Sequence, residues 1–333
     1  MAATTVVVRG PNWLGDTVMA LPALAALRAG MPGARITFVG RWASLLRGQG
    51  VADDLIEYPR DRRRRRALNR ALAGDPADLA LLLPTSFEAA LAAWRWRARR
   101  RIGFDGDGRR PLLTGAEPRP LPRQHQIDEY RRLVEALGIA APADRPRLAV
   151  PPDAAAEHAV AALLRDAGIA PGAKPVGLHL GVAGGAAKRW PVESFAALAD
   201  RLSAAGLAPL LLGGPEDAPL AGRALAAARS APPSLVGKDR PALLPHLLAR
   251  LGGLVSGDTG VAHLAAALGV PTVTLFGPTD PALTAPRGPA ADLVVGPAPC
   301  APCMLDTCPI EHVCMRAIAS ADVAARVLAR VRP

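Results

Sequence analysis

The sequence predicts an α/β protein with two doubly wound domains. Patterns typical of strands and of helices alternate along both halves of the chain, and residues 140–152, rich in alanine and proline, separate the halves. The 333 residues suffice for two cores of ordinary size, and the 50% hydrophobic content excludes a disordered or fibrous protein. We therefore place an N-terminal domain at residues 1–150 and a C-terminal domain at residues 151–333.

The first half opens with a β-α-β pattern. Thr5–Arg9 is a short run of valine and threonine typical of a strand, and it is followed by the loop Gly10–Gly15 and a helix from about Thr17 to Ala29. Two further strands and an amphipathic helix are predicted at Arg35–Val39, Leu79–Leu83 and Ile127–Leu137. This order is typical of a parallel sheet with helices on its faces.

The second half repeats the alternation. Strands are predicted at Val176–Leu180, Ala208–Leu212, Gly253–Ser256 and Thr272–Phe276, and helices at Ala154–Ala167, Val192–Ala205 and Val261–Leu268. In sheets of this kind, ligands bind at the carboxyl ends of the strands. The loops that leave the strands are therefore the places where function is expected.

Positive charge is concentrated in the first half. Residues 1–150 contain 25 arginines against 15 acidic residues, whereas residues 151–333 contain 15 basic and 14 acidic residues. Such a surface attracts phosphate, and nucleic acid, an anionic membrane surface or a phosphorylated acceptor would all fit it. A solvated arginine-rich surface without a partner fits as well. No helix-turn-helix, zinc-finger or RNP pattern is present.

The N-terminal segment and the longest uncharged stretch bear on localisation. The segment MAATTVVVRG lacks the basic start and the long apolar run of a signal peptide, so we expect a cytoplasmic protein. The stretch between Asp258 and Asp280 is long enough for a membrane span. Its glycines and prolines instead favour a helix, a turn and a buried strand.

The first candidate site is the loop that follows the first predicted strand. It reads GPNWLGD at residues 10–16 and brings the carboxylate of Asp16 to the start of a helix. Aspartate is a preferred N-cap residue, so capping alone would explain Asp16. The G-x-G-x-x-G spacing of dinucleotide-binding loops is absent, which argues against a dehydrogenase.

A second candidate site follows the strand at Val176–Leu180. Gly181, Gly184 and Gly185 would let the backbone approach a bulky anion, and Lys188 adds a compact positive charge. A plain strand-to-helix loop with exposed cations is the alternative. The spacing excludes a Walker A motif, in which the lysine directly precedes a serine or threonine at the helix start.

The third candidate site reads SGDTGVAH at residues 256–263 and again joins a buried strand to a helix. The backbone N–H groups of Thr259 and Gly260, at the positive end of that helix, suit a diphosphate. Asp258 would orient a hydroxyl or cap the helix. His263 is either a ligand contact or a buried core residue.

Two acidic motifs carry weaker signals. Glu216, in the loop after the strand Ala208–Leu212, could accept hydrogen bonds from sugar hydroxyls, although a turn there needs no function. Asp105 and Asp107 spell the D-x-D of metal-dependent glycosyltransferases. Because arginines follow directly and the nucleotide motifs lie in the other half, we interpret the second motif as a turn.

Together these motifs resemble the ADP-heptose:lipopolysaccharide heptosyltransferases of glycosyltransferase family 9, with most similarity to their type II branch. The resemblance extends from Val6 to about Val327. Its most specific segments are GPNWLGDTVMALPAL at Gly10–Leu24, KRWP at Lys188–Pro191, GDTGVAHLAAALGVPTV at Gly257–Val273, FGPTDP at Phe276–Pro281 and a cysteine-rich segment. It implies the GT-B architecture, in which two Rossmann-like domains face each other across a cleft. The final helix could pack back on the first domain.

The resemblance also implies an activity and roles for residues. The activity is transfer of a heptose from ADP-heptose to a lipopolysaccharide inner-core or similar acceptor, with inversion and without a catalytic metal. Asp16 would be the general base, and Asn12, Trp13 and Gly15 would form the acceptor-side loop. The donor would be held by Gly184, Lys188, Glu216, Asp258, Thr259, Gly260 and His263. Some relatives carry paired hydroxyl residues where this chain has Ala183 and Gly184, so backbone amides would replace them.

The expected partners follow from that activity. They are an ADP-sugar donor and a phosphorylated, lipid-linked saccharide acceptor. The basic first domain also suggests peripheral contact with the anionic inner membrane. Nucleic acid is not expected, and no cofactor is required.

All four cysteines lie in one short segment, at Cys300, Cys303, Cys308 and Cys314. Four thiolates this close could hold a structural zinc ion, and a reducing cytosol argues against two disulfides. Free buried thiols or a redox-labile loop are equally open. We expect the segment to lie away from the residues that carry the transfer.

Two other functions stay open. A nucleic-acid-binding protein would explain the arginines but would leave the three strand-end loops unexplained. A GT-B enzyme that uses another nucleotide-sugar or acceptor, such as a nucleotide-sugar epimerase, would keep the motifs of the second half.

Overall fold

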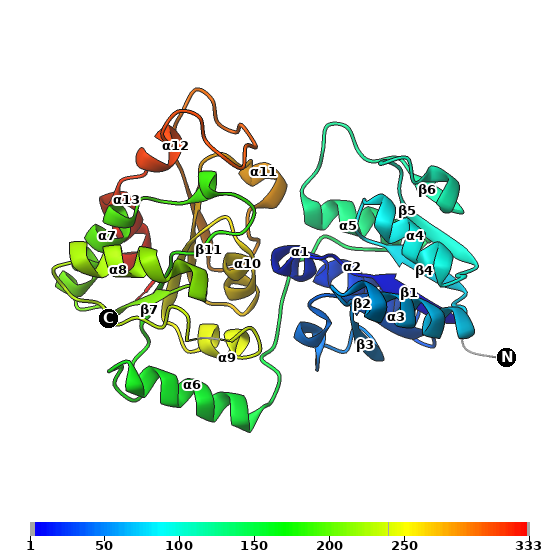
Figure 1. Cartoon of the computed structure of the whole chain (residues 1–333), viewed down its shortest axis with the longest axis horizontal. Coiled ribbons are helices and arrows are strands. Elements are labelled where there is room, and N and C mark those ends of the chain that lie inside the picture. The colour runs from blue at the N-terminus through cyan, green and yellow to red at the C-terminus, as the bar shows by residue number, and fades with distance from the viewer. Residues whose placement is uncertain (1–3, 239, 332–333) are drawn as a thin grey trace. The chain divides into compact units, whose positions relative to one another are not determined.

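The computed structural model describes residues 4–238 and 240–331 and contains two units. One unit ends at Pro151 and the other begins at Pro152. Residues 139–153 form neither helix nor strand and connect α5 (Gln126–Glu135) with α6 (Ala154–Asp166), as Figure 1 shows. Within the described residues, no helix is long and apolar enough to cross a membrane.

A six-stranded parallel sheet forms the centre of the first unit, with the strand order β3-β2-β1-β4-β5-β6. The strands are β1 (Thr5–Arg9), β2 (Arg35–Gly40), β3 (Asp54–Glu57), β4 (Leu79–Leu82), β5 (Arg100–Phe104) and β6 (Gly115–Glu117). The chain builds outward from β1 to β3 and then returns to add β4 on the other side of β1. The winding therefore reverses between β1 and β4, which is where doubly wound sheets bind their ligands.

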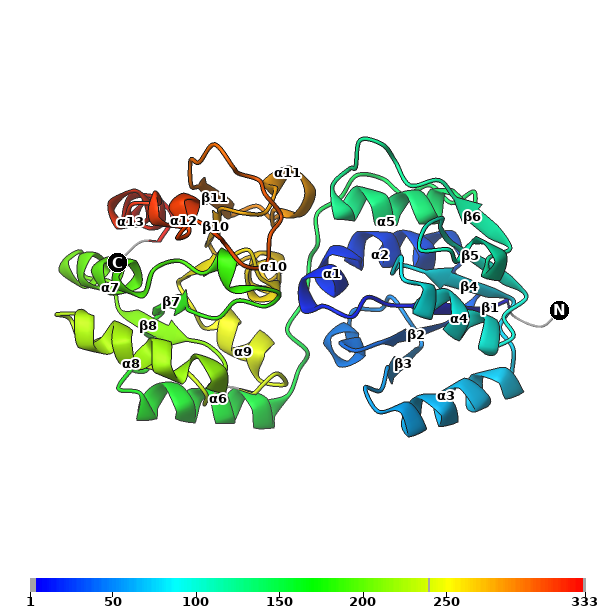
Figure 2. The ribbon, with the colours of Figure 1, turned by 45° about the horizontal axis from the view of Figure 1, so that its top comes forward.

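Helices cover both faces of this sheet (Figure 2). On one face α1 (Leu14–Met19) and α2 (Leu21–Gly30) pack with α5, and on the other α3 (Arg62–Gly74) packs beside α4 (Phe87–Arg95). Alanines of α4 enter the core against β1 and β4. By contrast, α3 has no buried residue at all. Short 3-10 helices span Ala43–Leu46 and Arg110–Leu112.

The first helical region differs from the single helix predicted from Thr17 to Ala29. The structure has two helices, α1 and α2, and the first already begins at Leu14. Pro22 lies in the first turn of α2 and has no backbone N–H to donate, so the hydrogen-bond ladder is interrupted there.

The second unit has a five-stranded parallel sheet in the order β11-β10-β9-β7-β8. Its strands are β7 (Val176–His179), β8 (Pro209–Leu212), β9 (Gly253–Gly257), β10 (Thr272–Phe276) and β11 (Ala291–Val295). These runs are short and apolar. All five residues of β9 and all five of β10 are buried, as expected for a sheet covered on both faces. The winding reverses between β7 and β9.

Helices again lie on both faces of the second sheet. One group consists of α7 (Val192–Ala204), α8 (Ala218–Ala227) and α13 (Ser320–Leu328), and the other of α6, α9 (Leu244–Ala249) and α10 (Gly260–Ala267). The short helices α11 (Pro281–Thr284) and α12 (Val313–Arg316) follow β10 and β11.

The last helix, α13, packs on α7 and β10 of its own unit. Its apolar residues Val323, Ala324 and Val327 are buried in the core of the second unit. The apolar face of α13 is therefore used within the second unit.

Candidate active site

Asp16 lies in the first turn of α1, directly after the loop that leaves β1. Trp13 holds the N-cap position, and its side chain makes no capping hydrogen bond. The first hydrogen bonds of the helix come from Thr17. Its backbone N donates at 3.0 Å, and its Oγ1 donates at 2.9 Å, to the carbonyl oxygen of Trp13. The explanation of Asp16 as the N-cap residue is therefore wrong.

The surroundings of Asp16 include the buried hydroxyl of Tyr130 on α5. Burial raises the pKa of Tyr130 well above its ordinary value, and the negative charge of Asp16 raises it further. Asp16 itself is only half-buried. Its carboxylate is thus close enough to influence the buried hydroxyl electrostatically, and it keeps access to solvent.

Arg9, the last residue of β1, lies fully buried beside this loop. Its Nη1 donates to the carbonyl oxygen of Gly10, its Nη2 donates to Oδ1 of Asn12 at 2.9 Å, and its guanidinium lies 3.8 Å from the centre of the Tyr58 ring. Glu88 Oε2 is 3.7 Å from Nη2, and the Tyr58 hydroxyl donates to Glu88. Burial lowers the pKa of Arg9, and the charge of Glu88 counteracts this effect.

This cluster determines how Asn12 is oriented. A guanidinium has only donors, so the atom of Asn12 that faces Arg9 is the amide oxygen, and the NH2 group of Asn12 is left to donate elsewhere. Arg9, Tyr58 and Glu88 were not predicted as site residues. The sequence did carry a signal for Arg9, because this arginine ends an apolar strand directly before the loop.

In the second unit, Lys188 lies beside the amino end of α10. It belongs to a 3-10 helix, Ala186–Lys188, in the glycine-rich loop after β7, whereas α10 follows β9. Lys188 Nζ is 3.3 Å from the carbonyl oxygen of Asp258 and 3.9 Å from Asp258 Oδ2. Asp258 is buried, which raises its pKa, and the ammonium group of Lys188 lowers it. Two of the three predicted loops thus meet where the winding of the sheet reverses.

The amino end of α10 carries no side-chain cap. Thr259 is the N-cap residue, but its Oγ1 lies 2.9 Å from Ser256 Oγ instead of bonding to the helix. Ser256 Oγ in turn lies 3.4 Å from Nδ1 of His179, at the end of β7. Because the first N–H groups of a helix have no partner within it, those from Gly260 onward are suited to an anion.

His179 and Ser256 were not predicted as site residues. Burial lowers the pKa of His179 to about 4, so its imidazole is neutral at pH 7. The predicted residue His263 lies one turn into α10 and is 5% exposed, consistent with the core position considered for it.

The two glycines of the loop before Lys188 both have backbone angles that favour glycine. Gly184 has a φ of 78°, and a Cβ atom there would meet nothing within 4 Å. Gly185 has a φ of 123°, and a Cβ atom there would lie 2.6 Å from Cα of Asp306. One side of the loop is therefore open and the other is in close contact with the cysteine-rich segment.

That contact contradicts the expectation that the cysteine-rich segment lies away from the motifs that carry the transfer. Ala187, adjacent to Lys188, donates its backbone N–H to the carbonyl oxygen of Asp306 at 3.0 Å, and Met304 donates to the carbonyl oxygen of Pro278 at 2.8 Å. The segment therefore holds the glycine-rich loop and the FGPTDP segment in place.

The spacing of the four cysteines left a structural zinc site and free thiols open. All four thiols are free, and burial raises the pKa of Cys314. Across residues 4–238 and 240–331, no three histidine, cysteine, aspartate or glutamate side chains are grouped so that they could hold a metal ion. Exposure separates the thiols, since Cys300 is exposed and Cys314 is buried.

Glu216 is exposed in a 3-10 helix, Pro215–Asp217, directly after β8. Its carboxylate lies against Gly214, where a Cβ atom would be 2.5 Å from Oε1. Its neighbour Asp217, which was not predicted, is buried and accepts a hydrogen bond from the backbone N of Gly214 at 3.0 Å. Asp217 Oδ2 also approaches Gly181, so it links this loop to the glycine-rich loop.

The D-x-D motif forms a turn. Gly106, Asp107 and Gly108 have positive φ angles, and Asp105 pairs with Arg110 at 2.9 Å. That ion pair lowers the pKa of Asp105.

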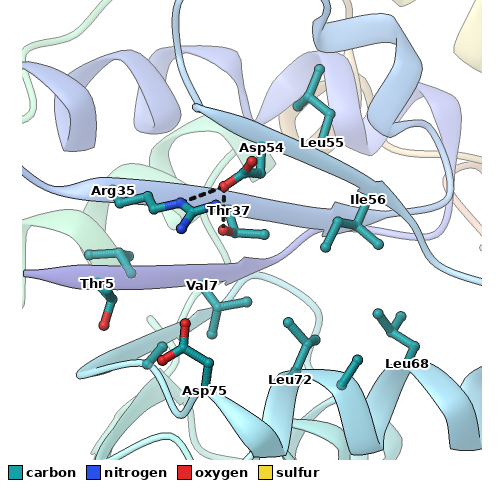
Figure 3. Close-up of a pocket in the computed structure, with 13 residues that line it drawn as sticks. Thr5, Val7, Arg35, Thr37, Asp54, Leu55, Ile56, Leu68, Leu72 and Asp75 are labelled. Atoms are coloured by element: carbon teal, nitrogen blue, oxygen red, sulfur yellow. Dashed lines mark hydrogen bonds and ion pairs between the residues drawn. The ribbon is translucent and has the colours of Figure 1, made fainter.

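A cavity of about 390 Å³ lies in the first unit between the sheet and α3 (Figure 3). It is lined by Thr5, Arg35 and Asp54, the first residues of their strands, and by apolar side chains of the sheet and of α3. It therefore extends to the amino ends of β1, β2 and β3, and the loops described above leave the opposite ends. The cavity is distinct from the candidate active site.

The chain belongs to glycosyltransferase family 9, because the model of that family, described as glycosyltransferase family 9 (heptosyltransferase), matches residues 65–314. This chain is 29% identical over 299 residues to lipopolysaccharide heptosyltransferase 2 of Salmonella typhimurium. The alignment covers 84% of this chain and 85% of that relative. The protein is therefore a glycosyltransferase, as its motifs predicted.

Two solved structures share the fold. The structure of E. coli ADP-heptose lps heptosyltransferase II superposes on this chain with a TM-score of 0.82 at 25% sequence identity. The superposition covers 98% of both chains. The glycosyl transferase family 9 protein from Veillonella parvula has a TM-score of 0.83 at 22% identity, covering 98% of this chain and 97% of that one. The predicted GT-B fold and the resemblance to the type II branch are thereby confirmed.

Proposed function

We propose that this chain is an inverting glycosyltransferase that transfers a heptose from ADP-heptose to a lipopolysaccharide inner-core or similar phosphorylated, lipid-linked acceptor. The names of its relatives support the donor and the acceptor, since they are heptosyltransferases and one is described with ADP-heptose. In this proposal the first unit binds the acceptor and the second binds the nucleotide-sugar.

The observation that carries the proposal is the position of Lys188 at the amino end of α10. An ammonium group beside the positive end of a helix dipole is electrostatically unfavourable unless a negative group lies between them. Asp258 supplies one carboxylate at 3.9 Å, but burial disfavours its charged form. A diphosphate placed against Lys188 and the N–H groups of Thr259 and Gly260 would be stabilised by both.

Donor binding in this proposal extends to the neighbouring loops. Gly184 lies on the open side of its loop, so the nucleotide-sugar can approach the backbone there. Glu216 is exposed after β8 and can accept hydrogen bonds from sugar hydroxyls. Asp258 directly precedes the N-cap residue of α10 and His263 lies one turn into this helix, and we assign both to the donor site.

For the chemical step we assign Asp16 as the general base. The acceptor hydroxyl loses its proton to the carboxylate of Asp16 as its oxygen attacks the anomeric carbon, and the bond to ADP breaks on the opposite face, which inverts that carbon. Negative charge grows on the leaving ADP, and Lys188 with the amides of α10 stabilises it. Asn12, Trp13 and Gly15 would contact the acceptor, with the NH2 group of Asn12 as a donor.

We propose that no catalytic metal ion takes part. Lys188 and the helix dipole supply the positive charge that a divalent cation provides in other glycosyltransferases. The D-x-D carboxylate of Asp105 is already paired with Arg110. Four free thiols suit a reducing compartment, so we also propose a cytoplasmic enzyme that contacts the inner membrane peripherally.

A transfer assay tests this proposal. Purified protein is incubated with ADP-heptose and an inner-core acceptor in excess chelator, and ADP release and the anomeric configuration of the product are measured. Transfer with inverted configuration, and no transfer from UDP- or GDP-sugars, is the expected result. Transfer only from another nucleotide-sugar, or only after a divalent cation is restored, would contradict it.

A further inference from the structure

The first turns of α3 carry a dense positive charge. Arg60, Arg62, Arg63, Arg64 and Arg66 are exposed. Considering residues 4–238 and 240–331, a carboxylate pairs with none of these five side chains, and only Arg65 in this run has an ion pair, with Glu88 at 3.7 Å. The arginine side chains therefore point into solvent without an anionic partner from the described chain.

Other arginines of the first unit behave differently. Ion pairs of 2.5 to 3.0 Å join Arg28 to Asp53, Arg35 to Asp54, Arg99 to Asp78 and Arg110 to Asp105. The sequence therefore places carboxylates beside many of its surface arginines. Further exposed arginines of this unit, such as Arg47, Arg95 and Arg97, also lack an ion pair within the described residues. The start of α3 is distinguished by its density, because residues 60–66 contain six arginines.

Two exposed aromatic residues lie at the same edge of the sheet as these arginines. Trp13 follows β1 and is 60% exposed, and Phe87 opens α4 after β4 and is 46% exposed. The start of α3 follows β3. Because all these strands are parallel, their carboxyl ends share one edge. We call Trp13, Arg60, Arg62–Arg66 and Phe87 the carboxyl-edge surface.

The packing of α3 on the sheet leaves its arginines exposed to solvent. The helix buries no residue, and Leu68 and Leu72 face Val7 and Ile56 across the cavity of about 390 Å³ (Figure 3). Successive helix residues are about 100° apart, so the run Arg62–Arg66 surrounds the first turns instead of forming one stripe. Some arginines of the run therefore face away from the sheet, where an anionic surface can reach them.

We propose that the carboxyl-edge surface binds an anionic lipid bilayer. Arginine guanidinium groups pair with lipid phosphates, and tryptophan and phenylalanine side chains insert at the level of the headgroups. The proposal rests on residues of the first unit alone. Its use by the enzyme rests on the proposed function: Asp16 lies three residues from Trp13, so binding would bring the general base to the bilayer from which a lipid-linked acceptor projects.

Sedimentation with vesicles tests the surface. The full-length protein is mixed with phosphatidylglycerol–phosphatidylcholine vesicles or with pure phosphatidylcholine vesicles, without ADP-heptose or acceptor. We expect binding to the anionic vesicles only, weakening as salt increases. In the variant Arg62→Gln/Arg63→Gln/Arg64→Gln/Arg66→Gln, the partition coefficient should fall roughly 600-fold if all four arginines contact the surface, since each contributes about fivefold.

A matched control removes the same charge elsewhere. Arg165, Arg201, Arg240 and Arg250 are exposed residues of the second unit, and their joint replacement by glutamine should change the partition coefficient less than about threefold. Phe87→Ser should weaken binding several-fold and Phe87→Trp should restore it. Circular dichroism of each variant establishes that it is folded.

Three results would overturn the proposal. They are equal losses in the two four-arginine variants, no binding of the unaltered protein to anionic vesicles, and tight binding to duplex DNA with none to vesicles. Because the vesicle assay contains neither donor nor acceptor, its outcome does not depend on whether the chain transfers heptose. Failure of the surface and failure of the proposed activity are therefore distinguishable.

Discussion

Arg9 Nη2 donates a hydrogen bond of 2.9 Å to Oδ1 of Asn12, and this contact fixes the side chain at the start of the loop that carries Asp16. The same guanidinium binds the carbonyl oxygen of Gly10 and stacks on Tyr58. A fully buried arginine is costly to desolvate, so its retention needs several simultaneous contacts. Two of those contacts, with Gly10 and Asn12, are to the loop, whereas Tyr58 and Glu88 hold the guanidinium from other elements, which makes Arg9 a positioning residue.

Replacing Arg9 with lysine tests this role. Lysine keeps the charge, but its single nitrogen cannot hold Gly10 and Asn12 together with the planar geometry of a guanidinium. We expect the KM for the acceptor to rise about tenfold, since a hydrogen bond from a charged donor is lost, while the Kd for ADP stays within about twofold. Steady-state kinetics with varied acceptor and calorimetry with ADP measure the two.

Arg28→Lys is the control for that experiment, because Arg28 pairs with Asp53. It should leave both constants unchanged. If Arg9→Lys weakens ADP binding as much as it raises the acceptor KM, Arg9 supports general folding and does not position the loop.

Asp16→Asn should lower kcat by about 10² to 10⁴ with little change in ADP affinity, because the amide cannot accept the proton of the acceptor hydroxyl. Asp61→Asn is the matched control. Asp61 caps α3 by accepting a hydrogen bond from the backbone N of Arg64 at 2.8 Å, and asparagine caps equally well. Rapid-quench transfer assays measure kcat, and full turnover by Asp16→Asn would exclude Asp16 as the base.

Gly185→Ala should weaken ADP binding about tenfold or more. Its Cβ atom would lie 2.6 Å from Cα of Asp306, so the loop that carries Lys188 would have to move. Gly206→Ala introduces similar backbone strain, with a φ of 81°, but its Cβ atom would meet nothing within 4 Å. Calorimetry should therefore find ADP affinity unchanged in Gly206→Ala, and equal losses in both variants would contradict the role of the segment around Asp306.

The pKa of His179 predicts a pH dependence of stability. Burial lowers that pKa to about 4 in the folded chain, whereas an exposed histidine titrates near 6.5. The unfolded state therefore binds the extra proton first, and the stability due to the neutral histidine is present above about pH 6.5 and is lost as the pH falls toward 4. The loss should be roughly 2 kcal/mol by pH 4.5.

Urea unfolding of the unaltered chain and of His179→Gln at pH 7.5 and pH 4.5 measures this contribution. Carboxylates titrate equally in both proteins, so the difference between them isolates His179. The free energy of unfolding should fall by roughly 2 kcal/mol more in the unaltered chain. An identical loss in both would show that His179 is protonated without penalty.

Apolar strands that are rich in β-branched residues were predicted well from the sequence. Thr5–Arg9 and Thr272–Phe276 are strands with the predicted bounds, because β-branched runs in a buried parallel sheet carry their own signal. The helix α3 was not predicted from the sequence, where its arginines contributed only to the positive charge of the first half. Its arginines and lack of a buried face give no apolar stripe, so periodicity could not indicate a helix.

Some site residues were also predictable from local sequence, whereas the contacts between them were not. The loops with Lys188 and Asp258 were found from their glycines and from their resemblance to the family, but their approach to 3.9 Å depends on β7 and β9 being neighbours in the sheet. The burial of Arg9 depends on Tyr58 and Glu88, which are distant in sequence. The contact of Asp306 with the glycine-rich loop likewise has no local signal.

Calorimetric titration with ADP tests the central claim, that Lys188 and the amino end of α10 hold the diphosphate of the donor. ADP, UDP, GDP and NAD are titrated without metal into the unaltered protein, into Lys188→Ala and into the control Lys174→Ala, whose lysine is exposed elsewhere in the second unit. We expect selective ADP binding that weakens about tenfold or more in Lys188→Ala and is unchanged in Lys174→Ala. Absence of ADP binding, binding of NAD alone, or equal affinity in Lys188→Ala would contradict it.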